Sequence, residues 1–444
     1  MLKHLLMIPT LAMHLSAGPS ELLDHVLNKY DKRVRPFIDD GKPVEVQMTI
    51  VLAILTELEE NNQVASFVIS HVQKWVDPNL VWDPAEYNGI DQLTVPQSLV
   101  WVPKMFIYNS MDTKDMLTEN RYDIRLKHDG NIKVNIPQYV TCICKLQIDL
   151  FPFDTQFCAI AQASPLLNIN EMVVNATQPP KDAYFSGNAE WEVINVTVRH
   201  MKFMEDGEYR VEVHYILHLH RRPIYYITVI VAPTFLISAL SILGIFSPGD
   251  SDGPRGEKVS LGLGSLLAMV VLLDIVANAM PKSNSIPLLG YYIIAVILLC
   301  ALGVGISMAM LGISRQMIES DNMPSQMAYS MVFMKRPKHF MDFWERMSNL
   351  DMMEEEIHVA PPKFPDLVGL FSRVQEIADA QIAFRKKIEK QKWLASVEKE
   401  WNRIFARYDY LFLSIFQILN LVVLLLFLRF SWLPIPQLPV DFSV

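Results

Sequence analysis

Short runs in which apolar and polar residues alternate fill the chain from Val44 to Leu219, and turns rich in Pro, Gly, Asn and Asp separate them. Two such runs are Val-Gln-Met-Thr-Ile-Val-Leu and Tyr-Arg-Val-Glu-Val-His-Tyr-Ile-Leu-His-Leu. Alternation with a period of two places one face of a strand in a core and the other in solvent. The pattern predicts an all-β sandwich of the immunoglobulin-like kind, preceded by a short helix from Glu21 to Arg35.

Four long apolar segments follow the β region. About 20 apolar residues suffice for a helix to cross a bilayer, and a helix satisfies its own backbone hydrogen bonds there. The 51% apolar content of the 444 residues fits such segments better than one large soluble core. The sequence therefore predicts an α+β multidomain membrane protein, a β-sandwich followed by a four-helix transmembrane bundle. The expected spans are Ile224 to Phe246, Val259 to Ala279, Ile286 to Leu311 and Tyr410 to Phe430.

The first residues have the composition of a cleaved secretory signal. They combine the basic Lys3, an apolar run and the small-residue ending Leu-Ser-Ala. Four spans then return both termini to the extracellular side. The expected layout is a signal peptide at 1–17, an extracellular β domain at 18–222, three spans within 223–311, a cytoplasmic loop at 312–408, a fourth span at 409–430 and an extracellular tail at 431–444.

The end of the cytoplasmic loop has a helical pattern. Between residues 367 and 407 apolar residues recur every three to four positions, and neither Gly nor Pro follows Gly369. We expect one long amphipathic helix that runs into the fourth span. A soluble charged helix would have the same pattern.

The second span carries a polar stripe at steps of three and four residues. Acidic side chains within a membrane are costly unless they face water or a partner. The span is therefore either a pore-lining helix, with Leu267 and Val271 as a hydrophobic constriction, or a buried helix whose Asp274 pairs with a basic neighbour. The stripe comprises Glu257, Ser260, Gly264, Leu267, Val271, Asp274 and Asn278.

Two cysteines flank a rigid apolar motif in the β region. Thirteen residues separate Cys144 from Cys158, and Phe-Pro-Phe-Asp lies between them. In an oxidising compartment the pair can close a loop, although Cys142 is near enough to compete, and Cys300 lies in an apolar run. Together with the four spans, this motif resembles the Cys-loop pentameric ligand-gated ion channels. The resemblance implies a disulfide between Cys144 and Cys158.

The same resemblance implies how the β domain acts on the pore. Arg221 would pair beneath the β domain with acids such as Glu60 and Asp154, and the loop tip would face the turn from Pro281 to Pro287. Alternatively, Arg221 and its neighbour Arg222 anchor the first span at the membrane surface. The residues implied in coupling are Glu60, Phe151, Pro152, Phe153, Asp154, Arg221 and Pro287.

Residues before the second span bear on ion selectivity. Cation channels of this family show Gly-Glu-Lys or a close relative there, and this chain has Gly256-Glu257-Lys258. Five glutamates at the pore mouth would attract sodium, potassium and potentially calcium ions and repel anions. The additional Arg255 keeps an anion-selective channel as an alternative.

The agonist site expected from the resemblance is incomplete. Nicotinic pockets hold a quaternary ammonium in a cage of aromatic rings. Tyr108 and Tyr209 fall at or near cage positions, whereas Pro165 and Ser70 replace cage tryptophans, and the adjacent cysteine pair is absent. Acetylcholine or a related amine is the expected agonist, with other subunits completing the pentamer. A different ligand is the alternative.

The remaining features limit other functions. The net charge of −9 argues against a nucleic-acid partner. Asn175 and Asn195 are candidate glycosylation sites. His218 and His220 lack a third metal ligand, and no enzyme motif or cofactor site appears. A postsynaptic plasma-membrane receptor is expected, and a non-conducting adhesion or scaffold protein is the alternative from another class.

Overall fold

A computed structural model of the chain describes residues 18–118, 121–180, 183–247, 256–279, 285–320, 322–335, 345–346, 348–350, 352 and 365–439. The expected signal peptide lies outside these residues. The chain divides into two compact units. The β unit comprises Met1–Tyr225, Asn278–Leu288 and Phe430–Val444, and the helical unit comprises Tyr226–Ala277 and Leu289–Arg429.

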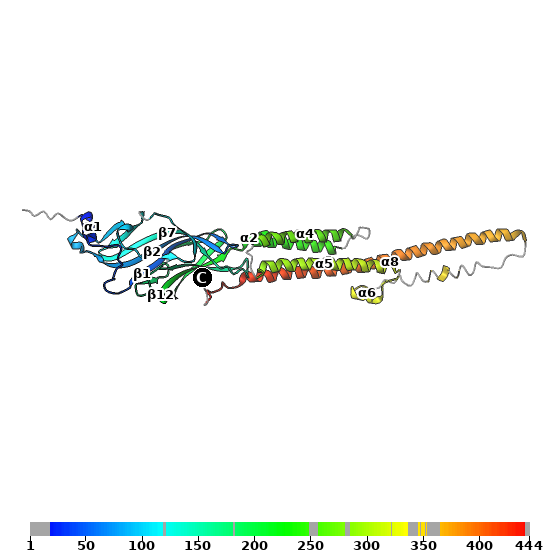
Figure 1. Cartoon of the computed structure of the whole chain (residues 1–444). Coiled ribbons are helices and arrows are strands. Elements are labelled where there is room, and N and C mark those ends of the chain that lie inside the picture. The colour runs from blue at the N-terminus through cyan, green and yellow to red at the C-terminus, as the bar shows by residue number, and fades with distance from the viewer. Residues whose placement is uncertain are drawn as a thin grey trace, which may run out of the picture. The chain divides into compact units, whose positions relative to one another are not determined.

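Two sheets form the β unit (Figure 1). The larger has the order β10-β1-β2-β7-β6-β3, with β5 added on β7 and β9 on β1, and the smaller has the order β11-β12-β8-β4. Most pairings are antiparallel, while β9 and β10 pair with β1 in parallel. The strands are β1 (Val44–Glu59), β2 (Val64–Val81), β3 (Gln92–Pro96), β4 (Phe106–Ile107), β5 (Ser110–Asp115), β6 (Asp123–Lys127), β7 (Asp129–Ile143), β8 (Thr155–Ala163), β9 (Met172–Ala176), β10 (Tyr184–Ser186), β11 (Trp191–Glu205) and β12 (Glu208–Arg221).

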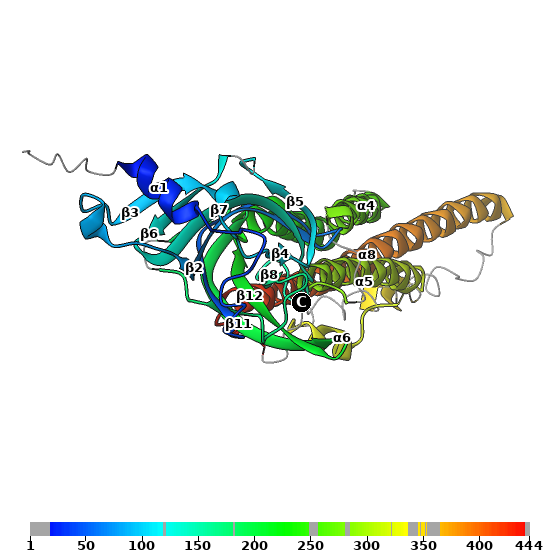
Figure 2. The same ribbon diagram turned by 60° about the vertical axis from the view of Figure 1, so that its left-hand side comes forward.

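One hydrophobic core lies between the two sheets. The strands curve around this core (Figure 2). Alternate residues of β1 and β6 are buried, as the period-two pattern requires. Trp75 and Phe67 enter the core from the larger sheet, and Tyr215 and Ile160 enter it from the smaller. The predicted β-sandwich is confirmed.

The N-terminal helix is shorter than the sequence predicts. Helix α1 spans Pro19–Leu27 and does not extend to Arg35. Beyond it, Asp31 Oδ1 accepts a hydrogen bond from the Arg33 backbone, a local contact that competes with helix formation. The Tyr30 hydroxyl donates to Asp77 at 2.7 Å and so fixes the chain to the sandwich.

Four helices of the described residues are long and apolar enough to cross a membrane. The first span runs from Ile224 to Phe246, as predicted, through α2 (Ile224–Tyr226), a π-helical turn (Ile227–Val231) and α3 (Ala232–Phe246). The second span is α4 (Gly256–Ala279). The third, α5 (Leu288–Glu319), extends beyond the predicted Leu311, and the fourth is the end of α8 (Pro365–Arg429).

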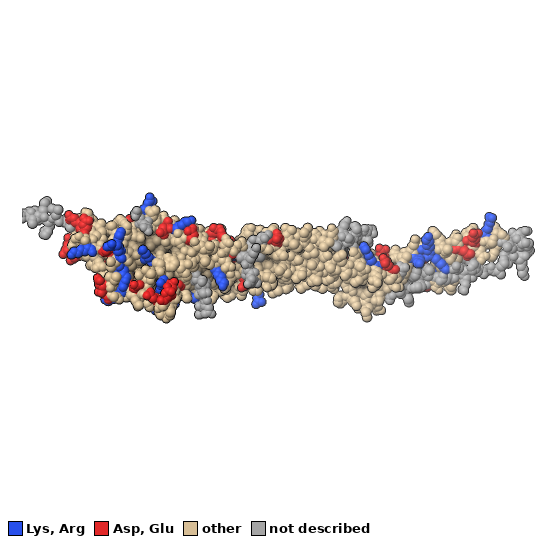
Figure 3. Space-filling view, in the orientation of Figure 1, with Lys and Arg blue, Asp and Glu red and all other residues tan. Residues whose placement is uncertain are grey.

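Helix α8 joins the predicted amphipathic segment and the fourth span without a break. Figure 3 shows charged residues on its first part, and a long stretch of the helical unit almost free of charge. A short helix, α6 (Gln326–Met331), packs on α8, where the Tyr329 hydroxyl donates to Glu400 at 3.0 Å.

Aromatic stacking and buried polar contacts hold the helical unit together. The ring of Phe246 in α3 lies 5.2 Å from that of Phe416 in α8. Ser238 of α3 donates to the buried Asn420 of α8 at 3.0 Å. A hydrogen bond between helices is favourable here because lipid offers the two groups no partner.

Candidate functional site

Cys144 and Cys158 form the disulfide that the resemblance implies, with their Cα atoms 5.1 Å apart. Cys142 and Cys300 are free and buried. Burial alone raises the pKa of the Cys142 thiol to about 12, so it remains protonated and inert. The bridge closes the loop that carries Phe151 and Asp154.

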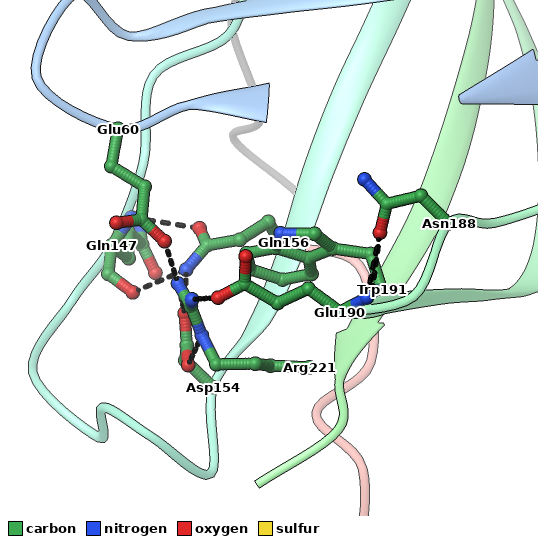
Figure 4. Close-up of polar contacts among 8 residues, drawn as sticks. All are labelled: Glu60, Gln147, Asp154, Gln156, Asn188, Glu190, Trp191 and Arg221. Atoms are coloured by element: carbon green, nitrogen blue, oxygen red, sulfur yellow. Dashed lines mark hydrogen bonds and ion pairs between the residues drawn. The ribbon is translucent and has the colours of Figure 1, made fainter. Parts of the chain in front are cut away.

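Arg221, at the end of β12, is buried at the centre of a cluster of three acids, of which Asp154 is buried and Glu190 is 41% exposed (Figure 4). Its Nε donates to Asp154 Oδ1 at 2.8 Å, its Nη1 donates to Glu190 Oε1 at 2.5 Å, and its Nη2 lies 2.5 Å from Glu60 Oε1. The Arg221 side chain is fully buried. The predicted pairing with Glu60 and Asp154 is therefore present, and the surface-anchor alternative is wrong for Arg221. It fits Arg222, whose side chain is 55% exposed.

Aromatic rings cover the same guanidinium. Its carbon lies 4.6 Å from the ring centre of Phe151 and 4.1 Å from that of Trp191. Gln156 donates to Asp154 Oδ2 at 2.6 Å and exchanges hydrogen bonds with the backbone of Gln147, which holds the Cys loop in place. Four chain segments thus meet at one cation.

Glu190 and Trp191 are functional candidates that the sequence reasoning missed. They lie 31 and 30 positions before Arg221, and their only local signal is Asn188, whose side chain accepts from both of their backbone amides. Nothing in that segment marks a partner for an arginine at the end of a later strand.

The charges of the cluster do not balance, since three carboxylates surround one guanidinium. Burial, aided by the carboxylates of Glu190 and Asp154, raises the pKa of Glu60 more than the Arg221 charge lowers it. Without Arg221, the buried Asp154 would have no cation among the ion pairs of the described residues. The arrangement fixes the Cys loop and the end of β12 as one body.

The Cys loop also contacts Leu288, the first residue of α5, which belongs to the β unit. The backbone amide of Leu288 donates to the carbonyl of Asp149 at 3.0 Å. Phe151, Pro152 and Pro287 are buried, and Phe153 is half-buried. The start of the predicted turn, Pro281 to Asn284, lies outside the described residues.

Helix α4 buries one face and leaves the predicted stripe uncovered. Over residues 260–277, whose side chains the structure describes, the buried residues are Gly262, Met269 and Val276, which recur every seven positions. A Cβ added to Gly262 would lie 2.7 Å from Val304 of α5, so this face packs closely on the bundle. At about 100° per residue, the buried face lies roughly opposite Leu267 and Val271, which are 67% and 52% exposed.

The other stripe residues agree with this face as far as they are described. Ser260 and Asp274 are exposed, and a Cβ at Gly264 would meet nothing within 4 Å. The side chains of Glu257 and Asn278 lie outside the described residues. No basic partner of Asp274 occurs among the ion pairs of the described residues, contrary to what the buried-helix alternative requires.

The candidate agonist residues are not assembled as a cage. The Tyr108 hydroxyl contacts Glu212 and His214, whereas the ring of Tyr209 is 48% exposed in the hairpin of β11 and β12. Ser70 is buried and donates to Asn135 at 2.6 Å. Pro165 is exposed, and its carbonyl accepts a hydrogen bond from Arg210 at 3.1 Å.

The remaining candidates lie at the surface of the strands. Asn175 in β9 and Asn195 in β11 are both exposed, as glycosylation requires. His218 and His220 bond to Thr197 and Thr155, and the described residues contain no group of three or more side chains that could hold a metal.

These features define a class: a membrane protein with a disulfide-closed loop in its β-sandwich and four apolar helices long enough to span a membrane. The model of the neurotransmitter-gated ion-channel ligand binding domain matches residues 19–223, and that of the transmembrane region matches residues 230–352. The chain therefore belongs to the Cys-loop family of pentameric ligand-gated ion channels, and to its nicotinic type. This is a family of channels, not of enzymes.

Three relatives illustrate the similarity. The chain is 34% identical to the neuronal acetylcholine receptor subunit alpha-9-I of Oncorhynchus mykiss over 278 residues, or 62% of this chain and 48% of the relative. It is 31% identical to the human alpha-10 subunit over 62% of this chain and 61% of that subunit. It is 30% identical to the proton-gated ion channel subunit pbo-6 of Caenorhabditis elegans over 62% of this chain and 64% of that subunit. The matched region thus spans about half to two thirds of these relatives.

Proposed function

We propose that this chain is one subunit of a pentameric, ligand-gated, cation-selective channel of the plasma membrane. The observation that carries the proposal is the orientation of α4, which packs Gly262, Met269 and Val276 on its own bundle and leaves Leu267 and Val271 on the opposite side. A stripe of this kind can line a pore that five copies surround. An adhesion or scaffold protein has no need of it.

The proposed layout follows from the channel function. The β unit, with Asn175 and Asn195, is extracellular, the 312–408 loop is cytoplasmic, and both termini of the mature chain are extracellular. A postsynaptic location is part of the proposal. It is supported by the acetylcholine receptor subunits among the relatives.

The Arg221 cluster supplies a route for gating in this proposal. It ties the Cys loop to the end of β12, and three residues later the chain enters the first span. A movement of β12 therefore shifts the Cys loop with it, and Asp149 of the loop is hydrogen-bonded to Leu288, the α5 residue that directly follows the turn. That turn follows directly on α4.

Selectivity is expected to depend on Glu257. The substitution Glu257→Ala should reduce single-channel cation conductance and move the reversal potential toward that of chloride, since the ring of negative charge is lost. Asp274→Asn should reduce inward conductance less strongly. Reversal potentials measured with sodium and chloride varied separately check this. A wild-type reversal potential that follows chloride would contradict the cation assignment and implicate Arg255.

The chain expressed alone is expected to respond weakly to acetylcholine. Each missing ring contact removes roughly 1–2 kcal/mol of attraction for a desolvated quaternary ammonium. Two such losses weaken binding by about one to three orders of magnitude. Dose–response curves of the chain alone and with nicotinic partner subunits test this heteromer proposal. Large currents at micromolar acetylcholine from the chain alone would disprove it.

A ligand other than an amine is the second candidate. Two observations favour it: the hydroxyl of Tyr108 is already bound within the chain, and one relative is called a proton-gated channel subunit. Voltage-clamp recording with amines, other transmitters and acidic solutions separates the two candidates.

A further inference from the structure

Three polar side chains meet on the outer face of the smaller sheet, where the expected cage is incomplete. The Tyr108 hydroxyl lies 2.7 Å from Glu212 Oε2 and 2.8 Å from His214 Nε2. The same Nε2 lies 3.0 Å from the same Oε2. Tyr108 follows β4, and both other residues belong to β12, so the cluster joins two strands that are not adjacent in the sheet.

The cluster is largely shielded from water. The side chain of His214 is 3% exposed and that of Glu212 is 15% exposed. The Nδ1 atom of His214 is buried without a hydrogen-bond partner in the structure. A neutral imidazole has one N–H, so its Nε2 can either accept from Tyr108 or donate to Glu212, and the two arrangements exclude each other. The contact is therefore sensitive to one proton.

The charges that face His214 come from three elements. On β12 they are Glu212 and Arg210. Arg210 lies two residues before Glu212 and is paired with Glu205 at 2.7 Å. Directly opposite on β11 is Arg199, whose Nη2 donates to the carbonyl of Pro439. The titratable Tyr108 comes from the turn after β4, and β8 contributes only the uncharged Ala161 opposite His214.

The tyrosine itself does not ionise near neutral pH. Burial, reinforced by the hydrogen bond to the Glu212 carboxylate, raises the pKa of Tyr108 well above its usual value. The hydroxyl therefore remains a donor. Its proton goes to Glu212 or to His214, and the choice depends on whether His214 is protonated.

We propose that Tyr108, Glu212 and His214 form a proton-binding site, and that a proton taken up there, rather than an amine, opens the channel. The proton comes from the extracellular solution and adds to the imidazole of His214. The imidazolium then donates Nε2–H to Glu212 and can no longer accept from Tyr108. The Tyr108 hydroxyl turns to Glu212 alone, and the contact between the β4 turn and β12 changes. This inference rests on the proposed channel function.

Strand β12 connects this site to the coupling cluster. It is continuous from Glu208 to Arg221, with nine of its residues paired to β8. Arg221 lies seven positions after His214 on this strand, which corresponds to roughly 23 Å. A shift of β12 at His214 is therefore carried by backbone pairing to the residue that holds the Cys loop.

Two other histidines of the β unit are poor candidates for the same response. Burial lowers the pKa of His71 to about 4, and burial also lowers the pKa of His218 below its usual value. In both cases desolvation disfavours the charged form of the imidazole. His218 is therefore a suitable matched control on the same strand and the same face.

The test is the pH dependence of current through channels that contain the full-length chain. Steps from pH 7.4 to 5.0 without any amine should open the wild type. His214→Gln should abolish this response, whereas His218→Gln should leave the half-maximal pH unchanged. Glu212→Gln should require about tenfold more protons, because it removes the negative charge beside the imidazolium. Tyr108→Phe should act in the opposite direction, because it removes a donor that favours the neutral imidazole.

Surface labelling and a background substitution separate the possible failures. All variants are also recorded with Leu267→Ser, which is expected to supply a current without ligand. If His214→Gln does not reach the surface, the opposite shifts in half-maximal pH expected for Glu212→Gln and Tyr108→Phe still test the proton site. A wild-type current that does not change with pH would contradict the proposed proton site, and so would an equal response to acid in His214→Gln. Neither result would contradict the channel function. No current from any variant, with or without partner subunits, overturns the channel function and the site with it.

Discussion

Arg221→Gln is expected to abolish current and most surface expression. The substitution removes the cation that Asp154, Glu60 and Glu190 share among the ion pairs of the described residues, and Asp154 is 2% exposed. Removing one partner of a buried ion pair costs about 3–5 kcal/mol. That is a large share of the roughly 5–15 kcal/mol by which a domain is stable. Surface labelling, followed by recording, measures both effects.

The matched control is Arg222→Gln. Arg222 is the next residue along the chain, its side chain is 55% exposed, and its contact with Glu192 is 4.0 Å long. An exposed pair of this kind contributes at most about 1 kcal/mol. Arg222→Gln should therefore retain normal expression and current. Equal effects of the two substitutions would show that Arg221 contributes only a positive charge, as Arg222 does, and that its buried contacts are not needed.

Leu267→Ser is expected to raise spontaneous current or ligand sensitivity by an order of magnitude or more. A ring of leucines narrow enough to expel water blocks ions without a plug, and serine keeps that region wet. Leu267 is 67% exposed in the single chain, so the substitution costs little packing within the chain's own bundle. Leak current relative to surface expression is the measurement.

Leu272→Ser provides the comparison on the same helix. Five positions further along α4, this side chain lies about 140° round the helix from Leu267 and is half-buried. It should change ligand sensitivity far less. A stronger effect at Leu272 than at Leu267 would mean that a different face of α4 lines the pore.

Local patterns in the sequence predict most of the fold. The sandwich, the four spans and the continuous end of α8 follow from periodicity and apolar length, which depend on neighbouring residues. The ends of α1 and α5 do not follow from these local patterns. Helix α1 stops early because residues near Asp31 bond locally and Tyr30 reaches Asp77, 47 positions away in the sequence.

In the candidate sites, too, local motifs predict some residues, and contacts between distant residues determine the others. The motif around Cys144 and Cys158 is compact and distinctive, so the resemblance identified the disulfide and the Glu60 and Asp154 partners of Arg221. The contacts of Glu190 and Tyr108 join residues about 30 to 106 positions apart in the sequence, and no local pattern encodes them. Tyr108 was expected in a cage, but the structure shows its hydroxyl bound to Glu212 and His214.

Accessibility of Val271 to a charged thiol reagent tests the pore assignment most directly. In a channel that contains Val271→Cys, an extracellular cationic methanethiosulfonate should reduce the current irreversibly, and it should do so faster when the channel is open. The native Cys142 and Cys300 are buried, so the background reaction should be slow. The account predicts a block at Val271 and none in a channel with Leu272→Cys. An unchanged current at Val271, together with a block at Leu272, would contradict it.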